Sequence, residues 1–187
     1  MTAKLQLRLV RDEKGGTGEI KMAYCFYDQT CFYPDATIED ICGEDYIELL
    51  TTCFQYSKYF SLTYLDRARD IPELDPFLVY SAYTHSWPGT RWTSEIGRFC
   101  VYRCTEETFQ FLCNYVDSVL SWDAHFEHET PEDLAFYRAD KTLFLESASH
   151  EGVCYLWNRP EENVFSVVSK NEWEFQEEPA PQNFYFY

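Results

Sequence analysis

The segment TEETFQFLCNYVDSVLSW, residues 105–122, carries the most regular pattern in the chain. Its apolar residues recur at helical spacing and form one stripe. The stripe consists of Phe109, Leu112, Cys113, Val116, Val119 and Leu120. Thr105 precedes two glutamates, which is typical of an N-cap followed by acidic residues at the positive end of the helix dipole. The pattern predicts a helix over 105–122 that packs its stripe against a core.

A second segment with helical spacing begins at Thr37. Its apolar residues at this spacing are Ile38, Ile41, Cys42, Leu49, Leu50 and Cys53. Thr37 and Asp40 together resemble a capping box. Gly43 is the weakest position of this segment, because glycine has a low helix propensity. The segment predicts a helix of about 15 to 18 residues from Thr37, and we therefore expect two main helices in the protein.

Shorter runs of β-branched and aromatic residues, bounded by turn residues, predict strands. One expected hairpin joins 4–10 to 20–27 through a Gly-rich turn, and another joins 142–150 to 152–158. Further strands are expected at 77–83, inside a proline-containing loop, at 97–104 and at 165–169. The sum is an α+β fold, with an antiparallel sheet built from hairpins and the two main helices packed on one face.

The length of 187 residues predicts a single globular domain over 1–187, and no linker divides the chain. Residues 172–187 form an acidic and aromatic tail in which prolines are expected to interrupt regular structure. The N-terminal MTAKLQLRLVRDE lacks the apolar core of a signal peptide. No apolar run reaches the roughly 18 residues of a membrane span. We expect a soluble protein in the cytoplasm of a bacterial host cell.

The net charge of −17 restricts the class of partner. Charge of this size repels DNA, RNA and anionic membrane surfaces. No basic stripe offsets it, because Arg91, Arg98 and Arg103 are isolated charges. The expected partner is therefore a basic protein surface, with no direct nucleic-acid contact and no membrane contact.

Histidine and cysteine patterns give no reason to expect catalysis. His125 and His128 are three residues apart among carboxylates, but further zinc ligands at defined spacings are missing. Ser149 and His150 are neighbours in sequence, whereas the residues of a catalytic triad meet through the fold. We expect no catalytic residue, no metal and no cofactor. A Cys/His hydrolase remains an alternative, and it requires a pocket that joins His150 or His125 to a cysteine thiolate.

Two long stretches contain carboxylates without any lysine or arginine. One lies between Lys21 and Lys58, and the other between Arg103 and Arg138. Each covers an expected helix, so its carboxylates are expected to project away from the core at spacings similar to those of phosphates. The alternative interpretation is an acidic surface that only keeps the protein soluble and binds no specific partner.

The sequence thus predicts a partner surface that combines these carboxylates with aromatic anchors. The residues predicted to bind the partner are Glu44, Asp45, Glu48, Asp117, Trp122, Asp123, Phe126, Glu127, Glu129, Glu132 and Asp133. Phe136 and Tyr137 are expected to serve as further aromatic anchors.

The segment PEDLAFYRADKTLFLESASHEGVCYLW (131–157), with LDPFLVYSAYTHSWPGT (74–90) before it, resembles a loose set of small acidic proteins. These occur in Gram-positive bacteria and their mobile elements under sporulation-like or immunity-like labels, and the set overlaps the cargo in which phage anti-CRISPR proteins are found. The resemblance covers roughly the second half of the chain and carries over no catalytic residues.

The resemblance and the charge together imply an acidic, non-enzymatic inhibitor that binds the basic nucleic-acid groove of a nuclease. The expected case is a phage anti-CRISPR protein that acts on an RNA-guided Cas nuclease. An immunity protein that neutralises a toxin nuclease is the first alternative, and the Cys/His hydrolase is the second.

The first testable prediction concerns the eight cysteines, which are irregularly spaced. All eight are expected to titrate as free thiols in denaturant when the protein is made in a reducing cytoplasm. A colorimetric thiol titration measures this, with a pre-reduced sample as the control. A clearly lower thiol count in the untreated sample would indicate a disulfide framework instead.

Overall fold

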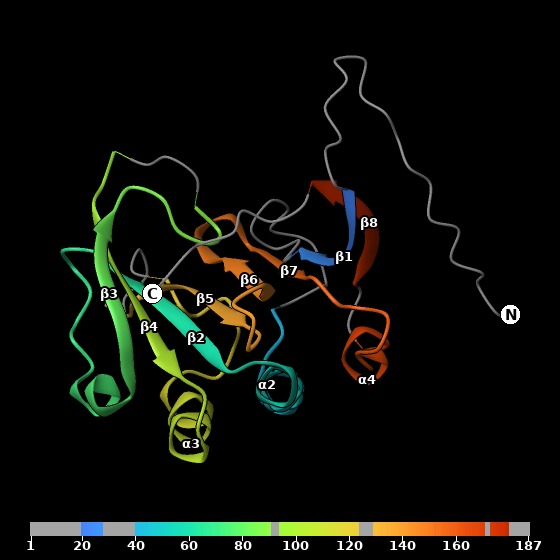
Figure 1. The fold of residues 1–187 in the computed structure, drawn as a ribbon, viewed down its shortest axis with the longest axis horizontal. Helices are drawn as coiled ribbons and strands as arrows, with labels where there is room; N and C mark the ends of the chain where they lie inside the picture. The colour runs from blue at the N-terminus through green and yellow to red at the C-terminus, as the bar shows by residue number, and fades with distance from the viewer. Residues whose placement is uncertain (1–19, 28–39, 91–93, 124–128, 171–172, 180–187) are drawn as a thin grey trace, which may run out of the picture.

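The computed structural model describes residues 20–27, 40–90, 94–123, 129–170 and 173–179 (Figure 1). Its eight strands form one sheet in the order β3-β4-β2-β5-β6-β7-β1-β8, and every neighbouring pair is antiparallel. The strands are β1 (Ile20–Tyr27), β2 (Tyr59–Tyr64), β3 (Leu78–Thr84), β4 (Gly97–Arg103), β5 (Glu132–Tyr137), β6 (Leu143–Ala148), β7 (Val153–Leu156) and β8 (Glu174–Pro179).

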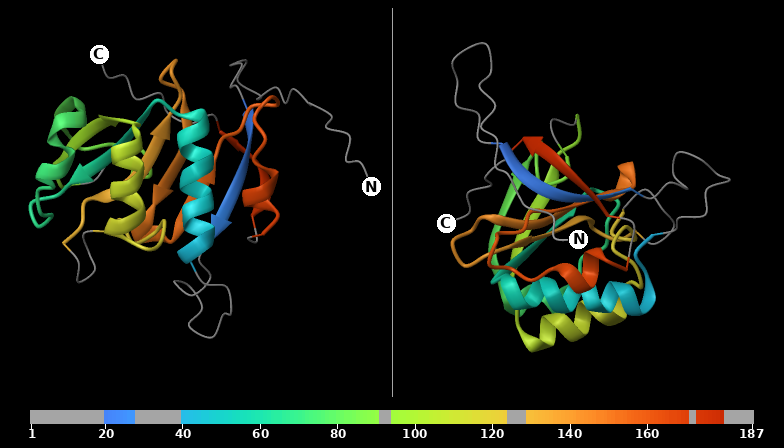
Figure 2. Two further views of the ribbon diagram at one scale, coloured as in Figure 1. Left: turned by 90° about the horizontal axis from the view of Figure 1, so that it is seen from below. Right: turned by 90° about the vertical axis from the view of Figure 1, so that its right-hand side faces the viewer.

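The helices α2 (Gly43–Tyr56) and α3 (Glu106–Tyr115) cover one face of this sheet, as Figure 2 shows. The short helix α4 (Phe165–Val168) lies on the same side. Two 3₁₀ turns, η1 (Pro72–Phe77) and η2 (Ser149–Glu151), complete the described elements. The expected α+β class, with an antiparallel sheet and two main helices on one face, is confirmed.

Both main helices are shorter than their sequence patterns predict, and the cause is shared. The chain before α2 pairs with the chain after α3 through an isolated bridge between Cys42 and Ser118. Gly43 donates its backbone N–H to the carbonyl of Asp117, and Val119 donates to Ile41. This pairing needs extended backbone, so Cys42 is the N-cap of α2 and α3 ends at Tyr115.

These observations correct both helix boundaries. The expected cap at Thr37 lies outside the described residues, and Val119 and Leu120 are buried beyond the end of α3 without being helical. The expected cap of the other helix is confirmed, because Thr105 accepts a hydrogen bond from the Thr108 N–H as the N-cap of α3.

The strand predictions are confirmed at β3, β4 and the β6–β7 hairpin. The first expected hairpin is not testable in its first strand, because 4–10 lies outside the described residues; β1 pairs with β7 and β8. The expected strand at 165–169 is wrong, since this segment contains α4. In the expected tail 172–187, β8 is regular as far as Pro179, the first proline of the tail, and residues 180–187 lie outside the described part of the chain.

The sheet has a core on each face. In β4, Cys100 and Tyr102 face the helices, whereas Phe99 and Val101 belong to a second cluster on the opposite face. No described helix covers this second face. The chain between β3 and β4 crosses it instead, and Trp87 from this connection is 2% exposed.

A buried ion pair fastens the chain after β7 to the sheet. Arg138, just after β5, donates two hydrogen bonds to the carboxylate of Glu162, and both side chains are 6% exposed. The same guanidinium donates to the backbone carbonyls of Leu143 and Trp157, so its donors are well used. Arg138 thus connects the end of β5 to the start of β6 and to the chain after β7.

The second prediction follows from this ion pair. Arg138→Ala leaves the Glu162 carboxylate buried without its cation, so the free energy of unfolding is expected to fall by about 3–5 kcal/mol in urea denaturation. The matched control is Arg159→Ala, which removes an exposed pair with Asp140 and is expected to cost under about 1 kcal/mol. Equal effects of the two variants would contradict this interpretation.

Candidate functional site

The aromatic residues predicted to anchor a partner lie in the core. Trp122 is fully buried and donates its indole N–H to the hydroxyl of Tyr46. Phe136 and Tyr137 are buried on the two faces of β5. The prediction that these three rings form a partner surface is therefore wrong.

Three of the predicted carboxylates are buried as well. Asp123, Glu132 and Asp133 are each at most 3% exposed. The reason is that β5, which contains two of them, lies between β2 and β6 in the middle of the sheet. The prediction that these carboxylates form an exposed acidic surface is corrected accordingly.

The remaining residues of the predicted acidic stretch do not form one described patch. Phe126 and Glu127 lie outside the described residues, as do His125 and His128. Glu129 is exposed, and its carboxylate makes an ion pair with Arg69.

Four predicted carboxylates do lie together on the helical side. Glu44 and Asp117 are exposed, and the hydrogen bond between Gly43 and Asp117 holds the start of α2 next to the end of α3. Asp45 and Glu48 are partly buried on α2 and pair with Lys170. We call Glu44, Asp45, Glu48 and Asp117 the α2–α3 acidic end.

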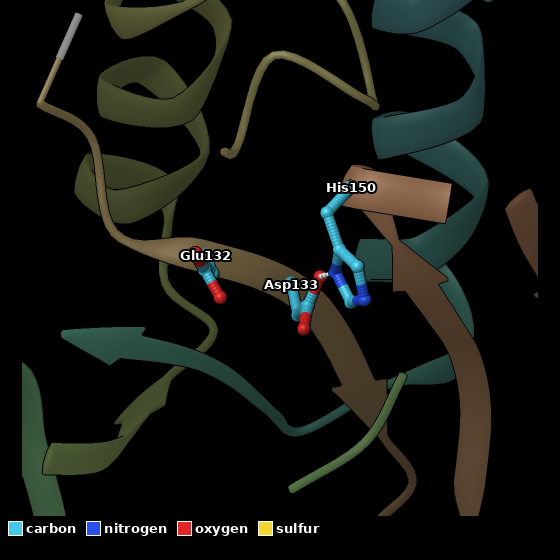
Figure 3. Close-up of side chains that lie close together, drawn as sticks. All are labelled: Glu132, Asp133 and His150. Carbon is cyan, nitrogen blue, oxygen red and sulfur yellow. Dashed lines mark ion pairs between the residues drawn. The ribbon is translucent and has the colours of Figure 1, made fainter. Parts of the chain in front are cut away.

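A different polar cluster lies on the opposite face of the sheet, where Glu132, Asp133 and His150 approach one another (Figure 3). One ligand atom from each side chain lies within 4.8 Å of the other two. Consecutive residues of a strand normally point to opposite faces. Here the β2–β5 register shifts and Asp133 has a φ of 57°, so Glu132 and Asp133 reach the same site.

The carboxylate of Asp133 is the centre of this cluster. Its Oδ2 accepts hydrogen bonds from Trp87 Nε1 at 2.7 Å and from Thr90 Oγ1 at 2.9 Å. Its Oδ1 accepts from the Ser149 backbone N–H at 2.9 Å and lies 3.9 Å from His150 Nδ1. Asp133 therefore joins the β3–β4 connection and η2 to the middle of the sheet.

A second buried carboxylate, Glu146, holds the same connection. It accepts hydrogen bonds from Trp157 Nε1 and from the backbone N–H of Gly89. Gly89 has a φ of 83°, and a Cβ atom there would lie 1.9 Å from the carbonyl oxygen of Ser147. Only glycine fits this contact, so the connection lies directly on β6.

The surroundings shift the acidity of the two neighbouring carboxyl groups. Burial raises the pKa of Glu132 to about 8, and repulsion from Asp133 and Asp123 adds to the shift. Burial also raises the pKa of Asp133 to about 6, while the hydrogen bonds from Ser149 and Trp87 act in the opposite direction. Both shifts bring the pKa of the group closer to neutral pH than that of an exposed carboxyl group.

The cluster offers a metal ion two carboxylates and an imidazole, and it also offers groups suited to proton transfer. A hydrolase with a cysteine nucleophile would need a thiol of lowered pKa. Burial instead raises the pKa of Cys53, Cys104 and Cys154. These three thiols are therefore unsuited to act as the nucleophile of a Cys/His hydrolase.

The sequence contained signals for this cluster that the charge pattern obscured. The apolar run Leu134–Tyr137 follows Pro131 and precedes the turn at Asp140, which is typical of a buried strand. The WPGT sequence at 87–90 is a turn signal that carries a tryptophan. Neither signal predicts that the carboxylate of Asp133 accepts a hydrogen bond from Trp87.

Comparison with protein-family models, with curated proteins and with solved structures found no match to this chain. None of the helices in the described part of the chain combines the length and the apolar character needed to cross a bilayer.

The third prediction concerns stability and pH. Because the folded-state pKa of Glu132 is raised to about 8, its contribution is fully present below the unfolded pKa and is lost as the pH rises toward 8. The free energy of unfolding is expected to fall by on the order of 1 to 2 kcal/mol between pH 6.5 and 8.5. Glu132→Gln, which resembles the protonated acid, is expected to remove most of this decrease.

Urea denaturation at a series of pH values, with EDTA present, measures the effect. Asp133 titrates in the same direction, but with a pKa of about 6 it contributes mainly below this pH window. The control is Glu161→Gln at an exposed position, which is expected to keep the wild-type decrease. A Glu132→Gln variant with the wild-type pH dependence would contradict the assignment.

Proposed function

We propose that the protein is an acidic, non-enzymatic inhibitor that binds the basic nucleic-acid groove of a nuclease through the α2–α3 acidic end. The observation that carries the proposal is the charge at this place. Glu44 and Asp117 are exposed, and neither makes an ion pair within the described part of the chain. Lys170, which pairs with Asp45 and Glu48, leaves an excess of negative charge there.

Exposed carboxylates elsewhere on the described surface differ in whether they are paired. Several exposed carboxylates there form ion pairs with arginine, namely Asp70 with Arg98, Glu95 with Arg67, Glu129 with Arg69 and Asp140 with Arg159. Within the α2–α3 acidic end, Glu44 and Asp117 can therefore pair with a basic partner without breaking an existing ion pair.

Exposed apolar side chains accompany these carboxylates. Ile47 on α2 is 44% exposed, and Tyr115 at the end of α3 is 38% exposed. Interfaces usually combine a few apolar or aromatic anchors with a polar rim. Ile47 and Tyr115 supply the anchors that the buried Trp122 does not supply.

The proposed target is an RNA-guided Cas nuclease, so the protein would act as a phage anti-CRISPR protein in the bacterial cytoplasm. The support is the resemblance of the second half of the chain and the net charge of −17, which disfavours direct nucleic-acid binding. An immunity protein against a toxin nuclease would use the same surface. The nuclease that is inhibited distinguishes the two.

The fourth prediction tests the surface. The triple variant Glu44→Gln, Asp45→Asn and Asp117→Asn removes three charges and keeps side-chain size. Against the nuclease that the wild type inhibits, its association rate constant is expected to fall roughly tenfold at low salt, with a smaller change in dissociation. The difference is expected to shrink as salt rises, because salt screens exposed charges.

The measurement uses cleavage inhibition and binding kinetics with purified RNA-guided Cas nucleases and purified toxin DNases. The matched control is Asp66→Asn, Asp75→Asn and Glu161→Gln, which removes three exposed charges elsewhere. An equal loss of inhibition and of association rate in both variants would mean that the net charge of the protein, and not this particular surface, drives binding. Full potency of the first variant would remove the α2–α3 acidic end from the mechanism, and no inhibition of either nuclease class would contradict the proposal itself.

A further inference from the structure

We infer that Glu132, Asp133 and His150 form a binding site for a divalent transition-metal cation on the face of the sheet opposite α2 and α3. The site is separate from the α2–α3 acidic end, so the inference does not depend on the proposed inhibition. Three ligand groups converge here from two places in the chain: two carboxylates come from the start of β5 and an imidazole comes from η2 (Figure 3).

The spacing of these groups suits a shared ion better than direct contacts. His150 Nδ1 lies 3.9 Å from Asp133 Oδ1, which is too long for a hydrogen bond. Ligand atoms that each lie about 2.0–2.2 Å from one cation are separated by roughly 3–3.6 Å from their neighbours. Side-chain movements of a few tenths of an ångström to about one ångström would bring the three groups to that separation.

The outer contacts of Asp133 resemble those of a metal ligand. Trp87 and Thr90 both donate to Oδ2, which fixes the orientation of the carboxylate. The Ser149 N–H uses one acceptor position of Oδ1, and a second position on this oxygen remains for an ion. Hydrogen bonds of this kind hold metal-binding side chains in position before the ion arrives.

A buried hydroxyl beside the cluster is a second, independent indication of a ligand. Thr63 is 1% exposed, and its Oγ1 has no hydrogen-bond partner among the described residues. Thr63 is the cross-strand partner of Glu132, so their side chains share a face of the sheet. A buried hydroxyl without a partner is unfavourable, whereas a water bound to the cation could hydrogen-bond to it.

Charge and access also fit a cation. Glu132 and Asp133 are adjacent and nearly fully buried, and a bound divalent ion would offset the repulsion between the two carboxylates when both are ionised. The side chain of His150 is 32% exposed and gives a route from solvent. Imidazole together with carboxylates favours Zn²⁺ or Mn²⁺ over Mg²⁺ or Ca²⁺.

The fifth prediction is tested on the full chain after EDTA treatment and dialysis. Isothermal titration with Zn²⁺ and with Mn²⁺ is expected to show about one ion per chain, and the same ion is expected to raise the melting temperature by several degrees. Mg²⁺ and Ca²⁺ are expected to bind at least tenfold more weakly. Glu132→Gln and His150→Ala are each expected to weaken Zn²⁺ or Mn²⁺ binding at least tenfold.

Two histidine controls separate this site from other histidines. His85→Ala alters an exposed imidazole that contacts the Glu95 carbonyl, and it is expected to keep wild-type binding. The double variant His125→Ala and His128→Ala is expected to keep it as well. Binding that is lost in that double variant and kept in His150→Ala, or the absence of Zn²⁺ and Mn²⁺ binding in the folded wild type, would overturn the inference.

Discussion

The carboxylate of Asp133 is the contact on which the second face of the sheet depends. No helix of the described residues covers that face, and its cover includes an irregular connection whose backbone and side-chain polar groups need partners. Asp133 accepts hydrogen bonds from Trp87, Thr90 and Ser149, and Glu146 accepts from Gly89 and a second indole. The two buried carboxylates thus hold the β3–β4 connection against the sheet by hydrogen bonds, whereas α2 and α3 are held there by their apolar stripes.

The fold class could be predicted from the sequence because hydrophobic periodicity is a local property. Regular spacing identified both main helices, and short runs between turn residues identified β3, β4 and the β6–β7 hairpin. The helix boundaries could not be predicted, because the pairing of Cys42 with Ser118 joins residues far apart in the chain. In both segments, the backbone near Cys42 and Ser118 is extended to form this pairing, although the local sequence favours a helix.

The candidate site could be predicted only in part, because carboxylates look alike in a sequence whether they are solvated or buried. Glu44 and Asp117 are exposed as expected, whereas Glu132 and Asp133 belong to a central strand. Acidic residues in β5 concealed the strand, and its burial depends on neighbours from distant parts of the chain. His150 was considered, but its approach to Asp133 required the register shift in β5.

The close contact at Gly89 has a consequence for how relatives of this protein can be recognised. Any side chain at that position would collide with the backbone of β6, so substitution there is incompatible with the same loop placement. Overall similarity between relatives fades quickly at the surface, because most surface substitutions change stability little. Distant relatives are therefore best sought by two linked features. One is a tryptophan two residues before a glycine, as in Trp87 and Gly89, and the other is an aspartate at the start of a later buried strand, as in Asp133.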